Sequence, residues 1–296
     1  MPRLELRKAL VVSTGKNSAW ISVDGECGTR IAQLRRMTGK RFMPVPGDVV
    51  YVRILEDERA VVDRMEPRSF ALERRTVEGR SKTMAANVDT LITVTALANP
   101  APRVTTLDQL LAFAELEGIA AAVVFTKPDL ASGHERERLV ETYAALDYPT
   151  MVANPKQGDN VDALRTFLHG RHALLSGISG VGKSTIFRAL GGEGDVGDLS
   201  RHGLGRQTTT SARLYRRSDG FLIDSPGVNE FGLGAIAPRE LAEAFREMRE
   251  PALHCRFGDC THLHEPGCAV RAAVDSGAIA QSRYASFVKI AQEVRS

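Results

Sequence analysis

Apolar and polar positions fall into two patterns along the chain, and the first covers residues 8–65. Five short runs rich in Val, Ile and other apolar residues occur here, several of them separated by turns with Gly, Asn or Asp: KALVVST, AWISVDG, TRIAQL, GDVVYVRI and RAVVDRM. Runs of this length between turn residues predict strands. Five short strands in so small a segment predict a closed barrel of the OB type, a fold whose face often binds oligonucleotides. A small barrel without a ligand would show the same pattern.

The second pattern begins after residue 70, where apolar strands alternate with helical stretches. TLITVTAL and AAVVFTKPD are almost continuously apolar, as expected of parallel strands covered on both faces. TTLDQLLAFAELEG, between them, has helical apolar spacing and ends at a glycine. PTMVAN, HALLSG and GFLIDSPG predict three more strands, each with a loop at its carboxyl end, where open α/β sheets bind ligands.

Helical patterns return from about residue 238, in PRELAEAFREM and YASFVKIAQEVRS, which bracket a cluster of cysteines. The sequence therefore predicts a multidomain α/β protein: an OB-type barrel over 1–70, a P-loop α/β domain over 71–237 and a helical metal-binding module over 238–296.

Composition fits a globular protein, because 43% of the 296 residues are apolar and 25% are charged. The chain has no apolar run long enough for a signal peptide or a membrane helix, so we expect a cytoplasmic protein without membrane contact. Residues 1–80 carry 16 Lys and Arg against 11 Asp and Glu. This excess suggests contact with nucleic acid, although a solvated basic surface has the same composition.

The firmest chemical motif is GISGVGKS, from Gly177 to Ser184, which matches the P-loop pattern G-x-x-x-x-G-K-[ST] in full. It follows an apolar strand and precedes a predicted helix, as the pattern requires. Its backbone N–H groups can surround phosphates, Lys183 can reach the β- and γ-phosphates, and Ser184 can bind Mg²⁺. The motif predicts a nucleoside triphosphate site.

Two later segments suit the phosphate side of such a site. Asp224 ends the apolar strand of LIDSPG, from where a carboxylate can hold the water shell of the metal, and Gly227 can donate its N–H to the γ-phosphate. Between the P-loop and Asp224 lies GRQTTT, residues 205–210. A threonine hydroxyl in this segment can complete the Mg²⁺ shell when the γ-phosphate is present, which would make the segment a switch.

FTKPDL, residues 125–130, is typical of a guanine-recognition loop. Asp129 can accept hydrogen bonds from N1–H and N2–H₂ of guanine, while Lys127 packs over the base and Thr126 stands where Asn is more familiar. Adenine lacks this pair of donors, so such a carboxylate selects against it. The loop precedes the P-loop in the chain, which indicates that the motifs of a GTPase have been circularly permuted.

Three of the four cysteines lie within 14 residues, in HCRFGDCTHLHEPGCAV. Cys255, Cys260, His262 and Cys268 form a Cys₃His set suited to one structural zinc ion. His254 and His264 compete with His262 as the fourth ligand, and three reduced buried cysteines are the alternative to a metal site. Cys27 is expected to be an ordinary barrel residue.

Together, the segments AANVD, TKPD, GISGVGKST, GRQTTT, LIDSPGVNEFGL and CRFGDCTHLHEPGCAV resemble the circularly permuted ribosome small subunit-dependent GTPase A family, RsgA. The resemblance covers nearly the whole chain. It implies GTP hydrolysis to GDP and phosphate that the small ribosomal subunit stimulates, a role in late maturation of that subunit, and contact with its rRNA.

The resemblance also assigns residues. It implies guanine binding by Thr126, Lys127 and Asp129, a switch at Thr208 and Thr209, a metal-side carboxylate at Asp224 and zinc binding by the four residues above. It implies binding of phosphates and Mg²⁺ by the segment from Gly177 to Thr185, including Ser179, Gly180, Val181, Gly182, Lys183 and Ser184.

The chain departs from the family pattern at two places. Gln207 stands where the family usually has His, and a glutamine can also orient the attacking water. Val228, directly after Gly227, cannot polarise water. The second base-side loop reads VANPKQGDN instead of a Ser-Ala pair, and there Ala153 is expected to offer its N–H to guanine O6. We therefore expect low intrinsic activity, with Lys183, Gln207 and Thr209 as catalytic residues.

Three functions compete on this sequence. The first is a monomeric GTPase that acts on the small ribosomal subunit, and the second is an RNA-binding assembly chaperone in which GTP is a slow timer. Gln207 keeps the second open. The third, an ATP-dependent kinase or ATPase, fits poorly with Asp129 and with the missing kinase lid pattern.

Overall fold

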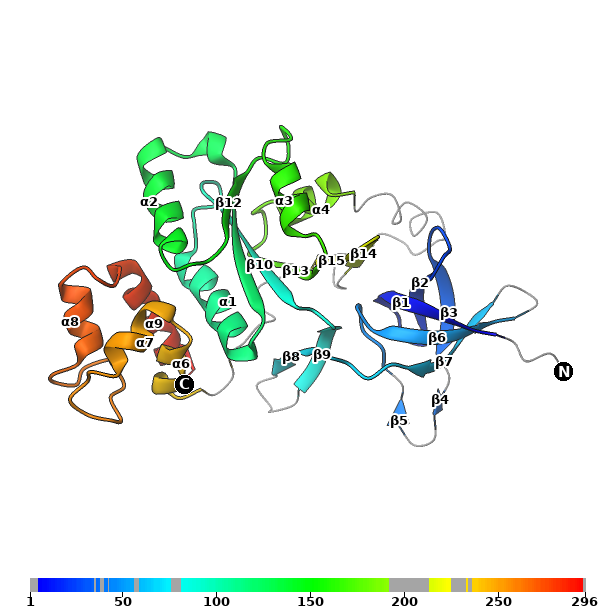
Figure 1. Cartoon of the computed structure of the whole chain (residues 1–296), viewed down its shortest axis with the longest axis horizontal. Coiled ribbons are helices and arrows are strands. Elements are labelled where there is room, and N and C mark those ends of the chain that lie inside the picture. The colour runs from blue at the N-terminus through cyan, green and yellow to red at the C-terminus, as the bar shows by residue number, and fades with distance from the viewer. Residues whose placement is uncertain are drawn as a thin grey trace.

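The computed structural model describes most of the chain, namely residues 5–34, 36–37, 40–41, 43–55, 59–75, 81–191, 213–224, 233 and 236–294. In Figure 1 a barrel lies at one end, an α/β sheet in the middle and a group of helices at the other end. No helix within these described ranges is long and apolar enough to cross a membrane.

The amino-terminal strands close a barrel, as predicted, and their order around it is β1-β2-β3-β7-β6. Val, Ala and Ile side chains of alternate positions fill its interior, because successive strand residues point to opposite faces. The strands are β1 (Leu6–Thr14), β2 (Ser18–Val23), β3 (Arg30–Leu34), β6 (Val49–Ile54) and β7 (Ala60–Met65). A ribbon of β4 (Arg36–Met37) and β5 (Lys40–Arg41) interrupts the series.

A hairpin that the sequence patterns did not predict, β8 (Ala71–Arg75) with β9 (Ser81–Ala86), follows the barrel. Its end packs closely on the barrel at Gly47, where a Cβ atom would lie 2.1 Å from the carbonyl oxygen of Ala86. Gly47 also has φ +93°, so only glycine fits this position without strain. Asn87 Nδ2 donates to the Gly47 carbonyl at 2.9 Å and fixes the junction.

The central sheet has six strands in the order β12-β11-β10-β13-β15-β14, of which only β14 is antiparallel to its neighbour. Three of the five residues of β14 are arginines, so its sequence has neither the apolar run nor the regular alternation that indicates a strand. The strands are β10 (Thr90–Ala96), β11 (Ala120–Thr126), β12 (Thr150–Ala153), β13 (His172–Ser176), β14 (Arg213–Arg217) and β15 (Gly220–Asp224).

Helices cover both faces of the sheet, so every residue of the central strand β10 is buried. One core joins the sheet to α1 and α2, and a second core joins it to α3 and α4. The helices are α1 (Val104–Glu117), α2 (Gly133–Ala144), α3 (Val161–Phe167) and α4 (Lys183–Ala189), together with the short 3₁₀ turn η1 (Pro128–Leu130).

Four helices form the carboxyl-terminal group beside α1 (Figure 1). Their apolar residues belong to the same core as α1 and α2, and Phe245 meets Phe287 edge to face at 5.6 Å between ring centroids. The helices are α6 (Pro238–Glu243), α7 (Arg246–Ala252), α8 (Ala269–Asp275) and α9 (Gln281–Glu293).

A buried ion pair links the last helix to the sheet domain. Arg283 of α9 is 1% exposed and donates to the carboxylate of Asp108 on α1 and, at 2.6 Å, to that of Glu247 on α7. Tyr143 of α2 donates to the same oxygen of Asp108 at 2.7 Å. Charged groups are rarely buried unless they are paired, so this network specifies how the helical group docks.

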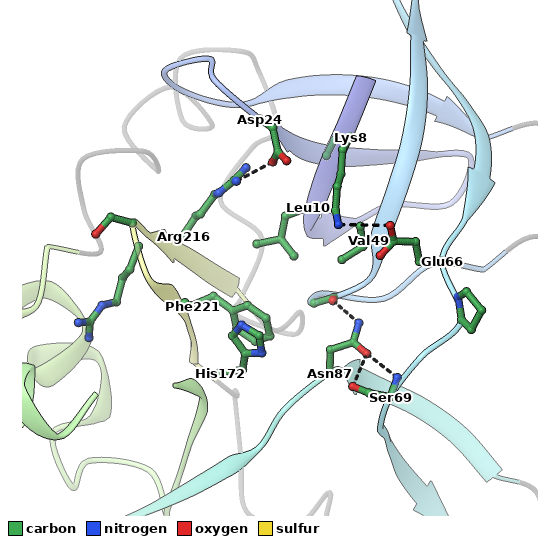
Figure 2. A pocket seen from close by; sticks show the side chains of 16 residues that line it. Lys8, Leu10, Asp24, Val49, Glu66, Ser69, Asn87, His172, Arg216 and Phe221 are labelled. Atoms are coloured by element: carbon green, nitrogen blue, oxygen red, sulfur yellow. Dashed lines mark hydrogen bonds and ion pairs between the residues drawn. The ribbon is translucent and has the colours of Figure 1, made fainter. Parts of the chain in front are cut away.

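A cavity of about 410 Å³ lies between the barrel and the amino ends of β13 and β15. Figure 2 shows the rings of His172 and Phe221 stacked at one side. Their ring centroids are 4.4 Å apart and the two rings are nearly parallel. Arg216 of β14 reaches across to Asp24 of the barrel at 2.6 Å and to the Ser22 carbonyl at 3.1 Å. These contacts connect the barrel to β14, which pairs with β15, the strand that ends at Asp224.

Candidate functional site

The P-loop connects the carboxyl end of β13 to the start of α4, as predicted from its pattern. At Gly177 a Cβ atom would lie 2.2 Å from the carbonyl oxygen of Val94, so a side chain would push the loop off the sheet. Gly182 caps α4 in the left-handed region with φ 102°. The two glycines therefore permit a tight turn whose N–H groups are available for an anion at the helix start.

Lys183 is buried and its ammonium group lies back on the loop. It donates to the carbonyl of Gly177 at 2.7 Å and to that of Ile178 at 3.0 Å. Burial lowers the pKa of this ammonium group, and the negative charge of Asp224 partly opposes the effect. A cation held by neutral carbonyls in a partly desolvated site interacts strongly with an anion placed beside it.

Asp224 lies beside Ser184, which is the arrangement expected for a magnesium site. β13 and β15 are neighbours, with Leu175 in register with Asp224, and the Ser184 hydroxyl donates to Asp224 Oδ2 at 3.1 Å. Asp224 Oδ1 is buried and has no hydrogen-bond partner within the part of the chain that the structure describes. Burial also raises the pKa of this carboxyl. An orphaned carboxylate oxygen next to a hydroxyl fits the oxygen ligands that Mg²⁺ prefers.

Of the other P-loop residues, Val181 contributes backbone alone, because its side chain is buried in the core beneath the loop. Thr185 is in the first turn of α4 and donates its N–H to the Gly182 carbonyl at 3.1 Å. Ser179 and Gly180 form the outer part of the turn, between the two glycines that shape it.

The base-side loop begins at the end of β11 and is tied to the P-loop by two side chains. The hydroxyl of Thr126 donates to the carbonyl of Val181. Lys127, in the left-handed region at φ 56°, donates its Nζ to the Gly180 carbonyl at 2.7 Å and to the Asn99 carbonyl. Threonine thus links the two loops here although the more familiar residue is Asn.

Asp129 lies on the turn η1, with an exposed side chain that one neighbour holds. Asn154 Nδ2 donates to its Oδ1 at 2.9 Å. Ala153 is in register with Thr126 at the end of β12, but its methyl group is buried in the sheet core. The sequence patterns did not single out Asn154; its position directly after a strand, at the carboxyl edge, was the available signal.

Four residues assigned from the sequence lie outside the described residues: Gln207, Thr208, Thr209 and Gly227. Val228 also lies outside them. Their assignments therefore remain predictions.

The predicted metal ligands come together at the end of the molecule opposite the barrel. One ligand atom from each of Cys255, Cys260, His262 and Cys268 lies within 4.8 Å of the others. His262 Nδ1 is 3.4 Å from Cys255 Sγ and 3.6 Å from Cys268 Sγ. Three thiols and an imidazole this close together can supply the four ligands of a tetrahedral zinc site.

The two competing histidines point elsewhere. His254 is exposed and lies 2.9 Å from Glu250, and His264 is exposed. His262 is 2% exposed, with φ 62°. The geometry therefore selects His262 among the three.

Outer contacts, which the sequence patterns did not predict, hold the cluster. The Glu265 carboxylate accepts from the N–H groups of Thr261, Leu263 and His264 at 3.0 to 3.2 Å, which closes the turn around His262. Burial opposes its ionisation, but hydrogen bonds from Thr261 above all lower the Glu265 pKa. Tyr284 of α9 donates its hydroxyl to the His262 carbonyl at 2.8 Å. Such contacts orient metal ligands.

Comparisons with known proteins agree with this geometry. The family model described as RsgA GTPase matches residues 65–234. The small ribosomal subunit biogenesis GTPase RsgA of Chromohalobacter salexigens is 40% identical over 82% of this chain and 73% of its own length. The protein of the same description from Pseudomonas aeruginosa is 38% identical over 93% of this chain and 83% of its own.

Two solved structures resemble the fold over almost the full chain. YjeQ from Thermotoga maritima superposes with a TM-score of 0.77 and 29% identity over 98% of this chain and 99% of that one. YloQ, described as a circularly permuted GTPase, gives a TM-score of 0.72 over 100% of this chain and 97% of that one, and at 21% identity it supports the fold alone.

Proposed function

Because the chain belongs to the RsgA GTPase family of GTP-hydrolysing enzymes, which act in ribosome biogenesis, we propose that it binds the small ribosomal subunit late in maturation and hydrolyses GTP with stimulation by that subunit. The convergence of the P-loop, Asp224 and the loop of Asp129 at one edge of the sheet carries the proposal. Circular permutation leaves this edge intact, since it alters only the order in which the chain visits the strands.

On the phosphate side, Lys183 exchanges its two carbonyl partners for the β- and γ-phosphates, which are stronger acceptors because they are charged. Ser184 and Asp224 hold Mg²⁺ directly or through water, and Thr209 joins them when the γ-phosphate is present. Bound Mg²⁺ neutralises charge that develops on the phosphate oxygens. The N–H groups of the segment from Gly177 to Thr185, and that of Gly227, complete the cradle.

On the base side, Asp129 accepts from N1–H and N2–H₂ of guanine. Lys127 packs across the base, since its ammonium group already lies against the P-loop. Thr126 acts mainly through its contact with Val181, which fixes the distance between base and phosphate subsites. Ala153 is proposed to contribute its N–H to O6.

Catalysis relies on Gln207 to orient water, since Val228 cannot. Intrinsic turnover is therefore slow, and the subunit supplies order or charge that in related GTPases is worth up to roughly 10⁵-fold.

We divide the chain into a barrel (1–70), a GTPase domain (71–237) and a zinc module (238–296). Docking on the small ribosomal subunit involves the barrel and the zinc module, which lie at the two ends of the molecule (Figure 1). The barrel carries the basic excess of the chain. The module holds one structural zinc through its Cys₃His cluster. Beside it, Leu253 is 82% exposed and Arg256 lies 5.4 Å from the ring centre of Phe257, a surface suited to stacking on RNA bases. The protein acts as a monomer in the cytoplasm.

The test is GTP turnover by the purified protein, alone and with small ribosomal subunits, with ATP as a blank. We expect slow turnover alone, strong stimulation by subunits, and no stimulated ATP hydrolysis. Tight subunit binding without stimulation would instead favour the RNA-binding chaperone with a slow GTP timer, for which the glutamine at 207 is the motivating observation.

Lys183→Ala should reduce stimulated turnover by roughly 100- to 1,000-fold, the range found when one donor to transition-state charge is removed. Arg138→Ala is the matched control, because Arg138 is an exposed cation on α2 away from the loop. Comparable turnover in the Lys183 variant and the Arg138 variant would contradict the phosphate role.

A further inference from the structure

We propose that Asn154 is the positioning residue that makes Asp129 selective for guanine. The inference rests on the proposed role of Asp129 in base recognition and adds to it a partner that the motifs do not assign. Asp129 is exposed and belongs to a turn of only three residues, so its own surroundings leave its carboxylate free to rotate. The hydrogen bond from Asn154 Nδ2 to Oδ1, at 2.9 Å, fixes its plane.

The backbone of Asn154 is itself held firmly. Its carbonyl accepts from the N–H groups of Gln157 and Asp159 at 3.0 and 3.1 Å, and its N–H donates to the Asp159 carbonyl at 3.2 Å. The residue follows β12 directly and is 6% exposed. The side-chain amide of Asn154 therefore extends from a fixed and buried backbone to the exposed carboxylate of Asp129. A donor held in this way can orient the carboxylate.

The chemistry of the pair suits guanine. An ionised carboxylate has about four acceptor sites, so one bond from Asn154 leaves enough for the two donors on the guanine edge. A neutral amide orients Asp129 and leaves its negative charge intact, whereas a lysine in the same place would neutralise that charge. Hydrogen bonds to charged groups are among the stronger ones.

This role also explains the departure from the Ser-Ala pair in the second base-side loop. Val152 and Ala153 are still in strand β12 and bring no polar side chain, and Pro155 has no N–H. Asn154 is thus the residue of VANP that can present a side-chain donor to Asp129.

The test is equilibrium binding of GDP, IDP, XDP and ADP to the full-length protein, compared with Asn154→Ala. IDP lacks the N2 amino group, and XDP carries an oxygen there. We expect GDP affinity to fall by about 10- to 100-fold, the value of one hydrogen bond to a charged group. The preference for GDP over IDP and XDP should shrink at the same time, because a rotating carboxylate cannot engage both donors.

Asn160→Ala is the matched control. Asn160 lies in the same loop and donates its Nδ2 to the Val152 carbonyl at 2.7 Å, without contact to Asp129. A purely structural role of Asn154 would weaken all nucleotides by a common factor and leave the ratios unchanged. That result, or unchanged GDP binding, would overturn the inference.

Asp129→Ala separates this inference from the one on which it rests. If Asp129→Ala abolishes the preference for GDP over XDP while Asn154→Ala leaves it intact, the positioning role fails and guanine recognition by Asp129 stands. If Asp129→Ala also leaves the preference intact, the guanine assignment itself fails.

A second measurement does not depend on the stability of Asn154→Ala. In Asp129→Asn, the Nδ2 group of Asn154 donates to the side-chain carbonyl oxygen of the new asparagine. The NH₂ group of that asparagine then faces the C2 oxygen of xanthine, so XDP should bind better than GDP. In the double variant Asp129→Asn with Asn154→Asp, the carboxylate at position 154 accepts from the NH₂ group of the asparagine at 129. The carbonyl oxygen of that asparagine then faces the C2 oxygen of xanthine. XDP binding should then fall by about 10- to 100-fold, and an unchanged XDP affinity would contradict the inference.

Discussion

Loss of the proposed zinc from the Cys₃His cluster should unfold the loop between α7 and α8 and abolish the proposed stimulation by the small subunit, while GDP binding survives. α6, α7 and α8 have six or seven residues each, which is too short for helices to be stable alone. The proposed zinc joins the end of α7, through Cys255, to the start of α8, through Cys268. Structural zinc contributes roughly 10 kcal/mol or more to folding in small modules.

Cys260→Ser is the variant of choice, because Cys260 is 3% exposed and central to the cluster. Metal content, limited proteolysis and GTP turnover are measured together. We expect zinc to fall from one per chain to well below one, and cleavage to appear between residues 253 and 268. Cys27→Ser is the control, since Cys27 is an exposed cysteine of the barrel.

The nucleotide site is remote from this cluster in the fold, so GDP affinity should change by less than about threefold. A metal-free protein that keeps protease resistance and subunit stimulation would contradict the structural role. A large loss of GDP affinity would show instead that the cluster supports the whole α/β domain.

Much of the architecture was predictable because it follows from local patterns. The barrel strands, the buried strands β10 and β11 and the P-loop all have short sequence signatures. The fold class and the family were predicted and are confirmed. β14 and the hairpin β8-β9 were missed, since their residues are mainly polar and tertiary contacts alone make them strands.

The supporting contacts could not be predicted because they join residues distant in sequence. Asn154 meets Asp129 across 25 positions, and Arg283 meets Asp108 across 175. The position of Asn154 directly after a strand does not say which residue it contacts, and a lone Arg in an amphipathic helix has no distinguishing pattern. By contrast, the choice of His262 over its two neighbours needed only the geometry of one loop.

The buried ion pair between α9 and α1 should be the largest single contribution of a side chain to docking of the carboxyl-terminal helices. Burial alone would lower the pKa of Arg283. The negative charges and hydrogen bonds of Asp108 and Glu247 raise it by more, so the net shift is upward and the guanidinium stays charged. Arg283→Met leaves two carboxylates buried without a cation. Removal of one partner of a buried pair costs about 3–5 kcal/mol, much more than loss of an exposed ion pair.

The cost should appear locally, as faster amide hydrogen exchange in α9 and α1, because a multidomain chain does not unfold in one step. Lys289→Met is the control: it removes an exposed cation from the same helix. Asp108→Asn added to Arg283→Met should recover part of the loss, since it removes one of the stranded charges.

The functional consequence follows from the position of Arg283 and Tyr284. The first residue joins α9 to the sheet domain and the second bonds the His262 carbonyl, so α9 connects the metal loop to α1. Arg283→Met should therefore weaken stimulation by the subunit more than GDP binding. Unchanged exchange in α1 with undiminished stimulation would mean that the apolar contacts around Phe245 and Phe287 dock the helices without the ion pair.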